Sequence, residues 1–137
     1  MVVGTGIDLV EIARIRRAVE RHGDRFLNRV FTADERAYCL RLRYPERHLA
    51  ARFAAKEAAL KALGTGVSLG IRWRDVEVRR GRAGRPEIEF HNVAAEMMAA
   101  VAATTAHLSL SHTDYHAIAL VILESQPEFP SYGGRDG

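Results

Sequence analysis

The residues best suited to chemistry are two acids far apart in the chain, Asp8 and Glu57, and one lysine, Lys61. Asp8 stands between Ile7 and Leu9, in a β-branched stretch where an acidic side chain is unusual. Glu57 lies in "RFAAKEAALKALGTG", among alanines and leucines. Because one or two carboxylates typically hold Mg²⁺, with water and phosphates as further ligands, this pair predicts a Mg²⁺ site. The chain has no histidine-cysteine cluster of the kind that binds zinc.

Each charged residue also has a purely structural interpretation. An acid at the end of a strand often caps the helix that follows, which would account for Asp8. Glu57 and Lys61 are four residues apart, so they can form a helical ion pair of only about 0.3–0.5 kcal/mol. The helix that carries Lys56, Glu57 and Lys61 is apolar nearly all round, which predicts burial. Its charges therefore need partners, but the residues alone leave these alternatives open.

The turn after Lys61, "GTGVSLG", has three glycines within seven residues. Backbone N–H groups of such a turn can approach phosphate oxygens closely, with Lys61 beside them as a point charge. The spacing matches neither the P-loop nor the dinucleotide-binding pattern, so the turn by itself is a weak phosphate signal.

Another polar stretch, "HLSLSHTD", places His107, Ser109 and Ser111 on one face of a strand and the intervening leucines on the other. His112 begins the turn, on the leucine side if the strand continues. Ser111 and His112 face opposite ways and no GxSxG elbow is present, so a serine hydrolase is not predicted. The structural alternative for each histidine is a strand-end residue with a local hydrogen bond.

The N-terminal half must supply the elements that position Asp8. Residues 2–9 have the pattern of a strand, and "VEIARIRRAVERHGDRF" has the apolar spacing of a helix with a stop at Gly23. In "TADE", Thr32 and Glu35 fit a capping box at the start of a second helix, which should end before Pro45.

The second half supplies the elements around Glu57. A long helix is predicted for about residues 46–63, with Gly64 as its C-terminal cap. "DVEVRR" and "PEIEF" predict a hairpin, Asn92 is expected to cap a helix in "VAAEMMAAVAAT", and "AHLSLSH" with "HAIALVILE" predicts a second hairpin. The fold class expected is α+β, with helices packed on a mostly antiparallel sheet.

Composition limits the class of protein. The 137 residues, 47% of them hydrophobic, predict one domain over residues 1–124 and a flexible tail over 125–137. A net charge of +3 favours anionic partners. Cys39 is the only cysteine, so no internal disulfide is possible and a cytoplasmic setting is expected. No signal peptide or membrane helix is predicted.

Four segments together resemble a known family. In this order and at these separations, "GTGIDLVEIARI", "FTADE", "RHLAARFAAKEAALKALGTG" and "HLSLSHTDYHAIALVILE" are similar to the holo-[acyl-carrier-protein] synthases, the small bacterial 4′-phosphopantetheinyl transferases. The resemblance covers residues 4–124, and its most specific part is Asp8 together with "RFAAKEAALKA". Thr113 follows His112 where some relatives have an acid, so no role is assigned to Thr113.

The resemblance implies transfer of phosphopantetheine from coenzyme A to a serine of an apo acyl carrier protein, in support of fatty acid biosynthesis. Asp8 and Glu57 would hold Mg²⁺ against the pyrophosphate, although Mn²⁺ is not distinguished from it. Glu57 or a metal-bound water would accept the serine proton, and Lys61 would stabilise the bridging phosphate oxygens.

The resemblance also implies binding roles for other residues. Coenzyme A would be bound by five residues, which are Arg52, Lys61, Gly64, His107 and His112. Three arginines assigned to the first helix would dock the acidic carrier protein, namely Arg14, Arg21 and Arg25; their structural alternative is a solvated basic face. The resemblance further implies a homotrimer with shared active sites.

Two rival functions belong to other classes. A basic nucleic-acid-binding module would use the arginines around Arg16 and Arg80, but aromatic residues make up only 7% of the chain, and this reading leaves Asp8 and Glu57 unexplained. Partners are therefore expected to include neither nucleic acid nor membrane. A metal-dependent phosphohydrolase would use water in place of the serine, and only an assay with a carrier protein separates it from the transferase.

Overall fold

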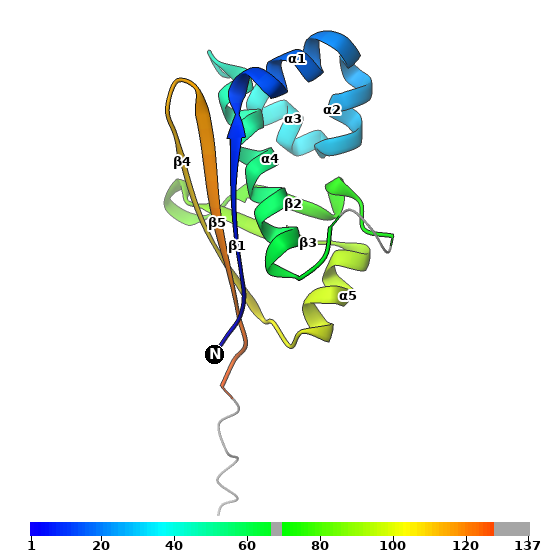
Figure 1. Ribbon diagram of the computed structural model, residues 1–137, viewed down its shortest axis with the longest axis vertical. Coiled ribbons are helices and arrows are strands. Elements are labelled where there is room, and N and C mark those ends of the chain that lie inside the picture. Colours follow the sequence, from blue (N-terminus) through cyan, green and yellow to red (C-terminus); the bar gives the residue numbers. More distant parts are fainter. Residues whose placement is uncertain (67–69, 128–137) are drawn as a thin grey trace, which may run out of the picture.

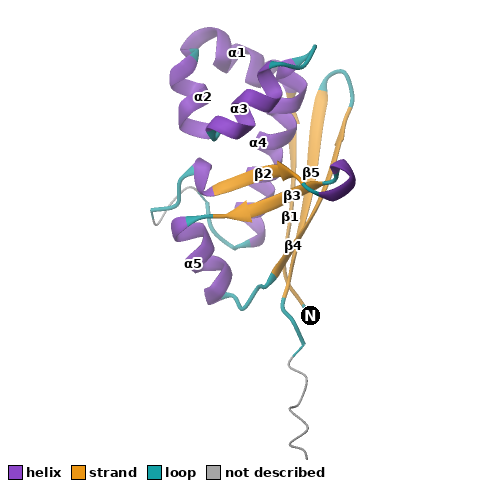
Figure 2. Cartoon of the chain, turned by 180° about the vertical axis from the view of Figure 1, so that it is seen from behind, coloured by secondary structure: helices purple, strands orange, loops and turns teal. Residues whose placement is uncertain are grey.

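The computed structural model describes residues 1–66 and 70–127, which fold into five α-helices and five β-strands (Figures 1 and 2). The strands are β1 (Val2–Glu11), β2 (Val76–Arg80), β3 (Pro86–Phe90), β4 (Thr105–His112) and β5 (His116–Glu124). The helices are α1 (Ile12–His22), α2 (Asp24–Val30), α3 (Ala33–Leu40), α4 (Pro45–Ala62) and α5 (Asn92–Ala100), with single 3₁₀ turns at Trp73–Asp75 and Arg82–Gly84. The predicted α+β class is confirmed.

Two antiparallel sheets surround one central helix. The larger sheet has the strand order β1-β5-β4, and β2 pairs with β3 in a separate hairpin. Helix α4 packs on the three-stranded sheet and also contacts α1, α3 and β2. Helices α1, α2 and α3 gather at one end of α4, while α5 lies at the other (Figure 1). Residues on different sides of α4 therefore meet different elements.

The three-stranded sheet has two unlike faces. Along β1, Gly6, Asp8 and Val10 are buried, whereas Ile7 and Leu9 are 57% and 63% exposed. Strand β5 repeats this alternation, with small or apolar residues turned inward and exposed residues on the other face. Because side chains alternate along a strand, the buried positions of β1 face α4. Asp8 is thus directed toward the helix that carries Glu57.

Helix α4 is buried nearly all round, as predicted from its composition. Five of its alanines are fully buried, namely Ala50, Ala54, Ala55, Ala58 and Ala59. Pro45 occupies the first turn, where the missing N–H does not matter. The helix gives way to Gly64, whose φ of 78° is the left-handed conformation expected of a helix-terminating glycine.

Most predicted elements are confirmed, with two corrections. The capping box of Thr32 and Glu35 is present, and both hairpins form as predicted. Gly23 does end α1, but a separate helix, α2, follows it directly. Asn92 is not the cap of α5: its side chain donates to Asp75 Oδ1 at 3.0 Å, and His91 occupies the cap position.

Two expectations concern the chain as a whole. None of the helices in the described residues is long and apolar enough to span a membrane. The flexible tail expected from residue 125 falls, from residue 128 onward, outside the part of the chain that the structure describes.

Candidate active site

The structure brings Asp8, Glu57 and Lys61 together between β1 and α4. Lys61 Nζ donates to Asp8 Oδ1 at 2.9 Å and to the carbonyl oxygen of Ile7 at 3.0 Å. Asp8 is only 8% exposed, while most of the Lys61 side chain remains open to solvent. The capping interpretation of Asp8 is wrong, because the residue before α1 is Glu11 and it makes no side-chain cap bond. The carboxylate that pairs with Lys61 is that of Asp8, from another element.

Glu57 lies beside Asp8, and the pKa of Glu57 reflects the close approach of the two acids. Three effects raise the pKa of Glu57 to about 7: burial, which is the largest, a hydrogen bond with Asp8, and the negative charge of Asp8. Arg14 and Lys61 oppose the shift. Like charges in close contact disfavour simultaneous ionisation, so one carboxyl of such a pair retains a proton well above its usual range. The hydrogen bond that Lys61 donates to Asp8 raises the pKa of Lys61. The site favours an additional positive charge.

One oxygen of this pair lacks a donor when both acids are ionised. Asp8 Oδ2 is buried, and no N–H or O–H group of the described residues donates to it; only the Glu57 carboxyl, when protonated, shares a further hydrogen bond with Asp8. Buried carboxylate oxygens are normally satisfied, so an orphaned one next to a second carboxylate is a feature that needs explanation. Hard divalent cations take oxygen ligands, and Mg²⁺ in particular is held by one or two carboxylates. The residues present therefore fit Mg²⁺ as predicted from the sequence.

The end of α4 places backbone groups near Lys61. The Gly64 N–H donates to the Lys61 carbonyl at 3.0 Å, and a Cβ at Gly64 would meet no atom within 4 Å. The open space beside Gly64 agrees with the expected approach of a phosphate group, but residues 67–69 of the predicted turn lie outside the described residues.

Arg52 lies on a different side of α4 from Glu57. Five helical residues separate them, which corresponds to a rotation of roughly 140°. Arg52 is 6% exposed, its guanidinium stacks 4.4 Å from the centre of the Tyr38 ring, and its Nε has no partner among the described residues. It borders a cavity of about 390 Å³. A buried arginine of this kind is suited to an anion, because a guanidinium binds phosphate through several N–H groups.

Two further arginines converge on the same aromatic ring, and sequence analysis did not single out this cluster. Arg41 and Arg80 lie 5.3 and 5.4 Å from the Tyr38 ring centre, and Arg80 donates to the Tyr38 hydroxyl at 3.2 Å. Both line the Arg52 cavity. The sequence signal was the mixture of arginine and tyrosine between α3 and α4, but only the fold shows that Arg80 of β2 joins it.

The two histidines predicted to bind coenzyme A lie on opposite faces of the sheet. The His112 ring is 6.4 Å from the His48 ring of α4, on the same side of that helix as Tyr38. Burial, together with the positive charges of Arg52 and its neighbours, lowers the pKa of His48. His107 instead points to the outer face, where its Nε2 lies 3.3 Å from Glu124 Oε1. Within one chain, His112 lies near the Arg52 cluster and His107 does not.

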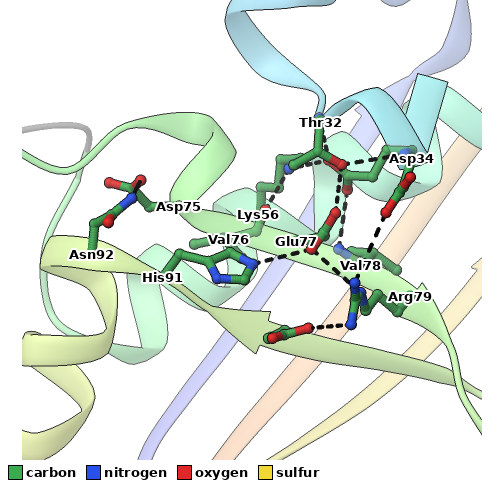
Figure 3. A network of polar contacts seen from close by, with 12 residues as sticks. Thr32, Asp34, Lys56, Asp75, Val76, Glu77, Val78, Arg79, His91 and Asn92 are labelled. Atoms are coloured by element: carbon green, nitrogen blue, oxygen red, sulfur yellow. Dashed lines mark hydrogen bonds and ion pairs between the residues drawn. The ribbon is translucent and has the colours of Figure 1, made fainter.

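The charged residue next to Glu57, Lys56, is fully buried and belongs to a different network (Figure 3). Lys56 Nζ lies 2.8 Å from Glu35 Oε1 and also donates to the carbonyl oxygens of Trp73 and Val76. The other oxygen of Glu35 accepts the Val78 N–H at 3.0 Å. The network therefore joins α3, α4 and β2, and every polar atom named in it has a partner.

The same network extends to a second group of acids that could be mistaken for a metal site. Ligand atoms of Glu77, Glu89 and His91 lie within 4.8 Å of one another. Arg79, however, already lies 3.4 Å from Glu77 and 2.7 Å from Glu89, and Thr32 donates to the remaining Glu77 oxygen at 2.6 Å (Figure 3). Since the carboxylates have these partners, this cluster lacks the orphaned oxygen that distinguishes Asp8.

The three arginines expected to dock a carrier protein are all exposed but belong to two helices. Arg14 and Arg21 are on α1, whereas Arg25 is on α2, which corrects the assignment of all three to the first helix. The reason is the φ of 52° at Gly23, which breaks the helix between them. Arg14 stacks 5.5 Å from the Phe53 ring and acts electrostatically on Glu57, so this basic surface borders the acidic pair.

Comparison with known proteins agrees with this geometry. Residues 4–121 match the 4′-phosphopantetheinyl transferase superfamily. A holo-[acyl-carrier-protein] synthase of Koribacter versatilis is 50% identical over 124 residues, which are 90% of this chain and 99% of the relative.

Two solved structures have the same fold. The crystal structure of the holo-[acyl-carrier-protein] synthase from Neisseria meningitidis matches with a TM-score of 0.84 and 30% identity, over 91% of this chain and 100% of the other. The Helicobacter pylori enzyme, solved in complex with coenzyme A, matches with a TM-score of 0.77 and 31% identity, over 88% and 99% of the two chains. The chain therefore belongs to the holo-[acyl-carrier-protein] synthases of the 4′-phosphopantetheinyl transferase superfamily.

Proposed function

We propose that this chain transfers the 4′-phosphopantetheine group of coenzyme A to a serine hydroxyl of an apo acyl carrier protein and releases adenosine 3′,5′-bisphosphate. The observation that carries the proposal is the pairing of buried Asp8 with half-buried Glu57, together with the orphaned Asp8 oxygen and the Lys61 ammonium 2.9 Å from Asp8. Phosphoryl transfer depends mainly on positioning and on stabilisation of phosphate charge, which such a group of residues supplies. The holo product is the form used in fatty acid biosynthesis, and we place the reaction in the cytoplasm.

Asp8 and Glu57 are the residues that would hold Mg²⁺. The bound ion would neutralise charge on the transferring phosphoryl group and on the leaving phosphate. Glu57, directly or through a metal-bound water, is the group that we assign to accept the serine proton, because the bound cation would keep its carboxyl ionised. Lys61, whose side chain is about half exposed, would lie against the phosphate oxygens of coenzyme A.

We further propose that Arg52 and His112 bind the nucleotide part of coenzyme A, together with Arg41 and Arg80. Their cluster lies on a different side of α4 from Glu57, so one chain alone does not offer both groups to one ligand. A neighbouring copy resolves this difficulty, since it would bring its own Arg52 cluster to the Glu57 site. His107 and Gly64 remain candidates for further contacts with the same ligand.

The outer face of the sheet supports assembly of the chain, which we propose is a homotrimer. Ile7, Leu9, Ile118 and Leu120 are between 36% and 63% exposed and lie on adjacent strands of this face. Contiguous apolar surface of this kind typically marks a protein interface. His107, which shares the outer face, would then lie close to a neighbouring subunit.

The carrier protein would dock on the basic surface formed by Arg14, Arg21 and Arg25. Acidic partners are steered to such a surface, and Arg14 would place the partner beside Glu57. Two of the arginines that the nucleic-acid alternative would use are paired internally: Arg79 with Glu77 and Glu89, and Arg16 with Glu46 at 3.5 Å.

The direct test is incubation of the protein with Mg²⁺, coenzyme A and apo acyl carrier protein, followed by mass spectrometry of the carrier. We expect the carrier to gain one phosphopantetheine group, with an equal amount of adenosine 3′,5′-bisphosphate released. Release of the nucleotide without any change in carrier mass would identify a phosphohydrolase instead.

Subunit sharing has its own test, which is complementation between variants. Glu57→Gln and Arg52→Ala are each expected to be inactive alone. If a site combines Glu57 of one copy with Arg52 of another, unfolding and refolding the two variants together restores part of the activity. Failure to restore any activity in confirmed mixed oligomers would show that each site is built within one chain.

A further inference from the structure

Strand β1 and helix α4 approach each other with no side chain between them at two positions. A Cβ at Gly6 would lie 1.9 Å from the Ala58 carbonyl oxygen and 2.9 Å from the Ala62 nitrogen. A Cβ at Gly4 would lie 2.2 Å from the Ala62 carbonyl oxygen. All three atoms belong to the helix backbone, which cannot rotate away as a side chain can. The strand therefore rests directly on the helix (Figure 1).

The need for glycine here is a matter of distance and not of backbone conformation. The glycines with positive φ among the described residues are Gly23, Gly64, Gly70 and Gly84. Gly4 and Gly6 have no positive φ and pair with Leu123 and Val121 of β5, although the register shifts between Val2 and Gly4. Any side chain could adopt this conformation, but none fits in the gap.

This close approach lies next to the acidic pair. Asp8 is the next inward-facing residue after Gly6 along β1, and Glu57 is the residue before Ala58 on α4. Lys61 spans the same gap, because its ammonium binds both the Ile7 carbonyl and the Asp8 carboxylate of the strand. The separation of strand and helix at Gly6 therefore fixes how far the Asp8 carboxylate stands from Glu57.

Strand β1 can be displaced more readily than a central strand if its separation from α4 changes. In the order β1-β5-β4, β1 is an edge strand that is hydrogen-bonded on one side only. A Cβ essentially never comes within 3.0 Å of such atoms, so Gly6→Ala would push β1 away from α4 by about 1 Å. A displacement of about 1 Å in a catalytic arrangement can reduce the rate by roughly 10²-fold.

We infer that Gly6, assisted by Gly4, is a positioning residue for the transfer reaction: its missing side chain sets the distance at which Asp8 and Glu57 share one divalent cation. The inference rests on the proposed function, and it assigns the spacing of the two carboxylates to the strand-helix contact. The backbone of Ala58 and Ala62 on α4 forms the other side of this close strand-helix contact.

The first test compares Gly6→Ala with the wild-type chain. We expect kcat to fall roughly 100-fold, and Mn²⁺ binding without coenzyme A, measured by loss of the free-ion EPR signal, to weaken roughly tenfold or more. The KM for the carrier protein should stay within about twofold, because the docking arginines lie on α1 and α2. The matched control is Gly81→Ala, whose Cβ would have its three nearest contacts with the flexible end of the Glu87 side chain and should leave all three values unchanged.

A second variant separates spacing from general damage. Asp8→Glu adds one methylene, which should misplace the carboxylate in the wild-type background and reduce Mn²⁺ binding. In the Gly6→Ala background the same change should reach across the widened gap and restore part of both Mn²⁺ affinity and kcat. A purely structural defect would not be repaired by a longer acid. Partial recovery in the double variant, relative to Gly6→Ala alone, therefore supports the role of Gly6 in spacing the carboxylates, and a further loss contradicts it.

The outcomes are distinct for the inference and for the proposed function. No transfer by the wild-type chain would defeat the proposed function, whereas wild-type transfer with unchanged kcat and Mn²⁺ affinity in Gly6→Ala would overturn the inference alone. If Gly6→Ala fails to fold, the same measurements on Gly4→Ala, one step farther from Asp8, should show a smaller loss in both quantities. Failure of both variants to fold would overturn the inference, because the glycines would then serve stability and not the site.

Discussion

Lys56 and Glu57 are neighbours in the sequence, yet the two sides of α4 on which they lie are built in opposite ways. On the Lys56 side, an ammonium and the Glu35 carboxylate are both fully buried and satisfied by backbone groups of β2 and by the turn before α3. On the Glu57 side, two acids crowd together, one carboxylate oxygen is orphaned, and the compensating Lys61 is half exposed. The polar groups on the Lys56 side therefore have all their partners, and we call this the complete side. The Glu57 side lacks a partner for one carboxylate oxygen within the part of the chain that the structure describes, and we call it the incomplete side.

The difference shows how one helix can serve both stability and chemistry. Buried charges are tolerated where paired and hydrogen-bonded, as Lys56 is, and they then lock neighbouring elements together. A pair of carboxylates without sufficient positive charge instead destabilises the unliganded fold. A bound cation would relieve the repulsion between the two carboxylates. Variants on the two sides should therefore fail in different ways.

The largest expected effect comes from the incomplete side. Glu57→Gln removes both a cation ligand and the proposed proton acceptor, so transfer should fall about 10⁴-fold, equivalent to about 5 kcal/mol in activation free energy. The chain should fold normally, because the change also removes the repulsion between the two acids. Carrier mass spectrometry and thermal unfolding of the same sample measure both. Near-wild-type transfer would remove Glu57 from the mechanism.

The complete side should respond in stability first. Lys56→Met leaves Glu35 as a buried unpaired carboxylate, so the free energy of unfolding should fall by about 3–5 kcal/mol, with the melting temperature lower by roughly 10 °C. Chemical denaturation provides the measurement. The double variant Glu35→Gln with Lys56→Met leaves no buried charge and should recover part of this loss. Unchanged stability with lost transfer would place Lys56 in the active site and erase the contrast between the two sides.

A pH titration sharpens the comparison with a smaller effect. In the metal-free protein the raised pKa of Glu57 means that the folded state binds more protons than the unfolded chain between pH 4.5 and about 7. The free energy of unfolding should therefore decrease as pH rises through this window, by about 1 kcal/mol once solvent screening of this partly exposed group is allowed for.

Urea denaturation at several pH values, with Glu57→Gln as reference, isolates this contribution. The variant lacks the titrating carboxyl, so its stability should exceed that of the wild type at pH 7 and converge with it near pH 4.5. Adding Mg²⁺ should reduce the difference, since a bound cation favours the ionised pair. A wild-type curve parallel to that of Glu57→Gln would show that the two acids do not repel.

Local pattern was sufficient for much of the fold. The capping box at Thr32, the alanine-rich helix ending at Gly64 and both hairpins follow from short-range preferences, and the structure confirms them. The predicted cap at Asn92 was wrong, because its side chain donates to Asp75, a distant residue, instead of capping α5. Helix α2, which follows Gly23 directly, was not predicted.

The types of residue in the site could be predicted from the sequence, but the contacts between their side chains could not. An acid within a strand and an acid within an alanine helix indicated Asp8 and Glu57, since the two together suggest a cation between them, although each alone has a structural explanation. No periodicity could show that Lys61 binds Asp8, or that Arg80 of β2 joins Arg52 at Tyr38, because these contacts join distant segments. The close approach at Gly6 was likewise invisible in a sequence where glycine predicts only turns.

The smallest expected effect concerns the surface beside the incomplete side. Arg14→Glu reverses one charge on α1 near Glu57, so the KM for an acidic carrier protein should rise roughly threefold at low salt, with a weaker dependence on ionic strength. The matched control is Arg82→Glu, an equal change of charge at an exposed arginine of the β2–β3 hairpin, which should leave the KM unchanged. Steady-state kinetics at two salt concentrations measure both variants. If the two reversals raise the KM equally, the carrier responds to net charge alone; if only Arg14→Glu does, the partner docks on the side of α4 where the acids stand unsatisfied.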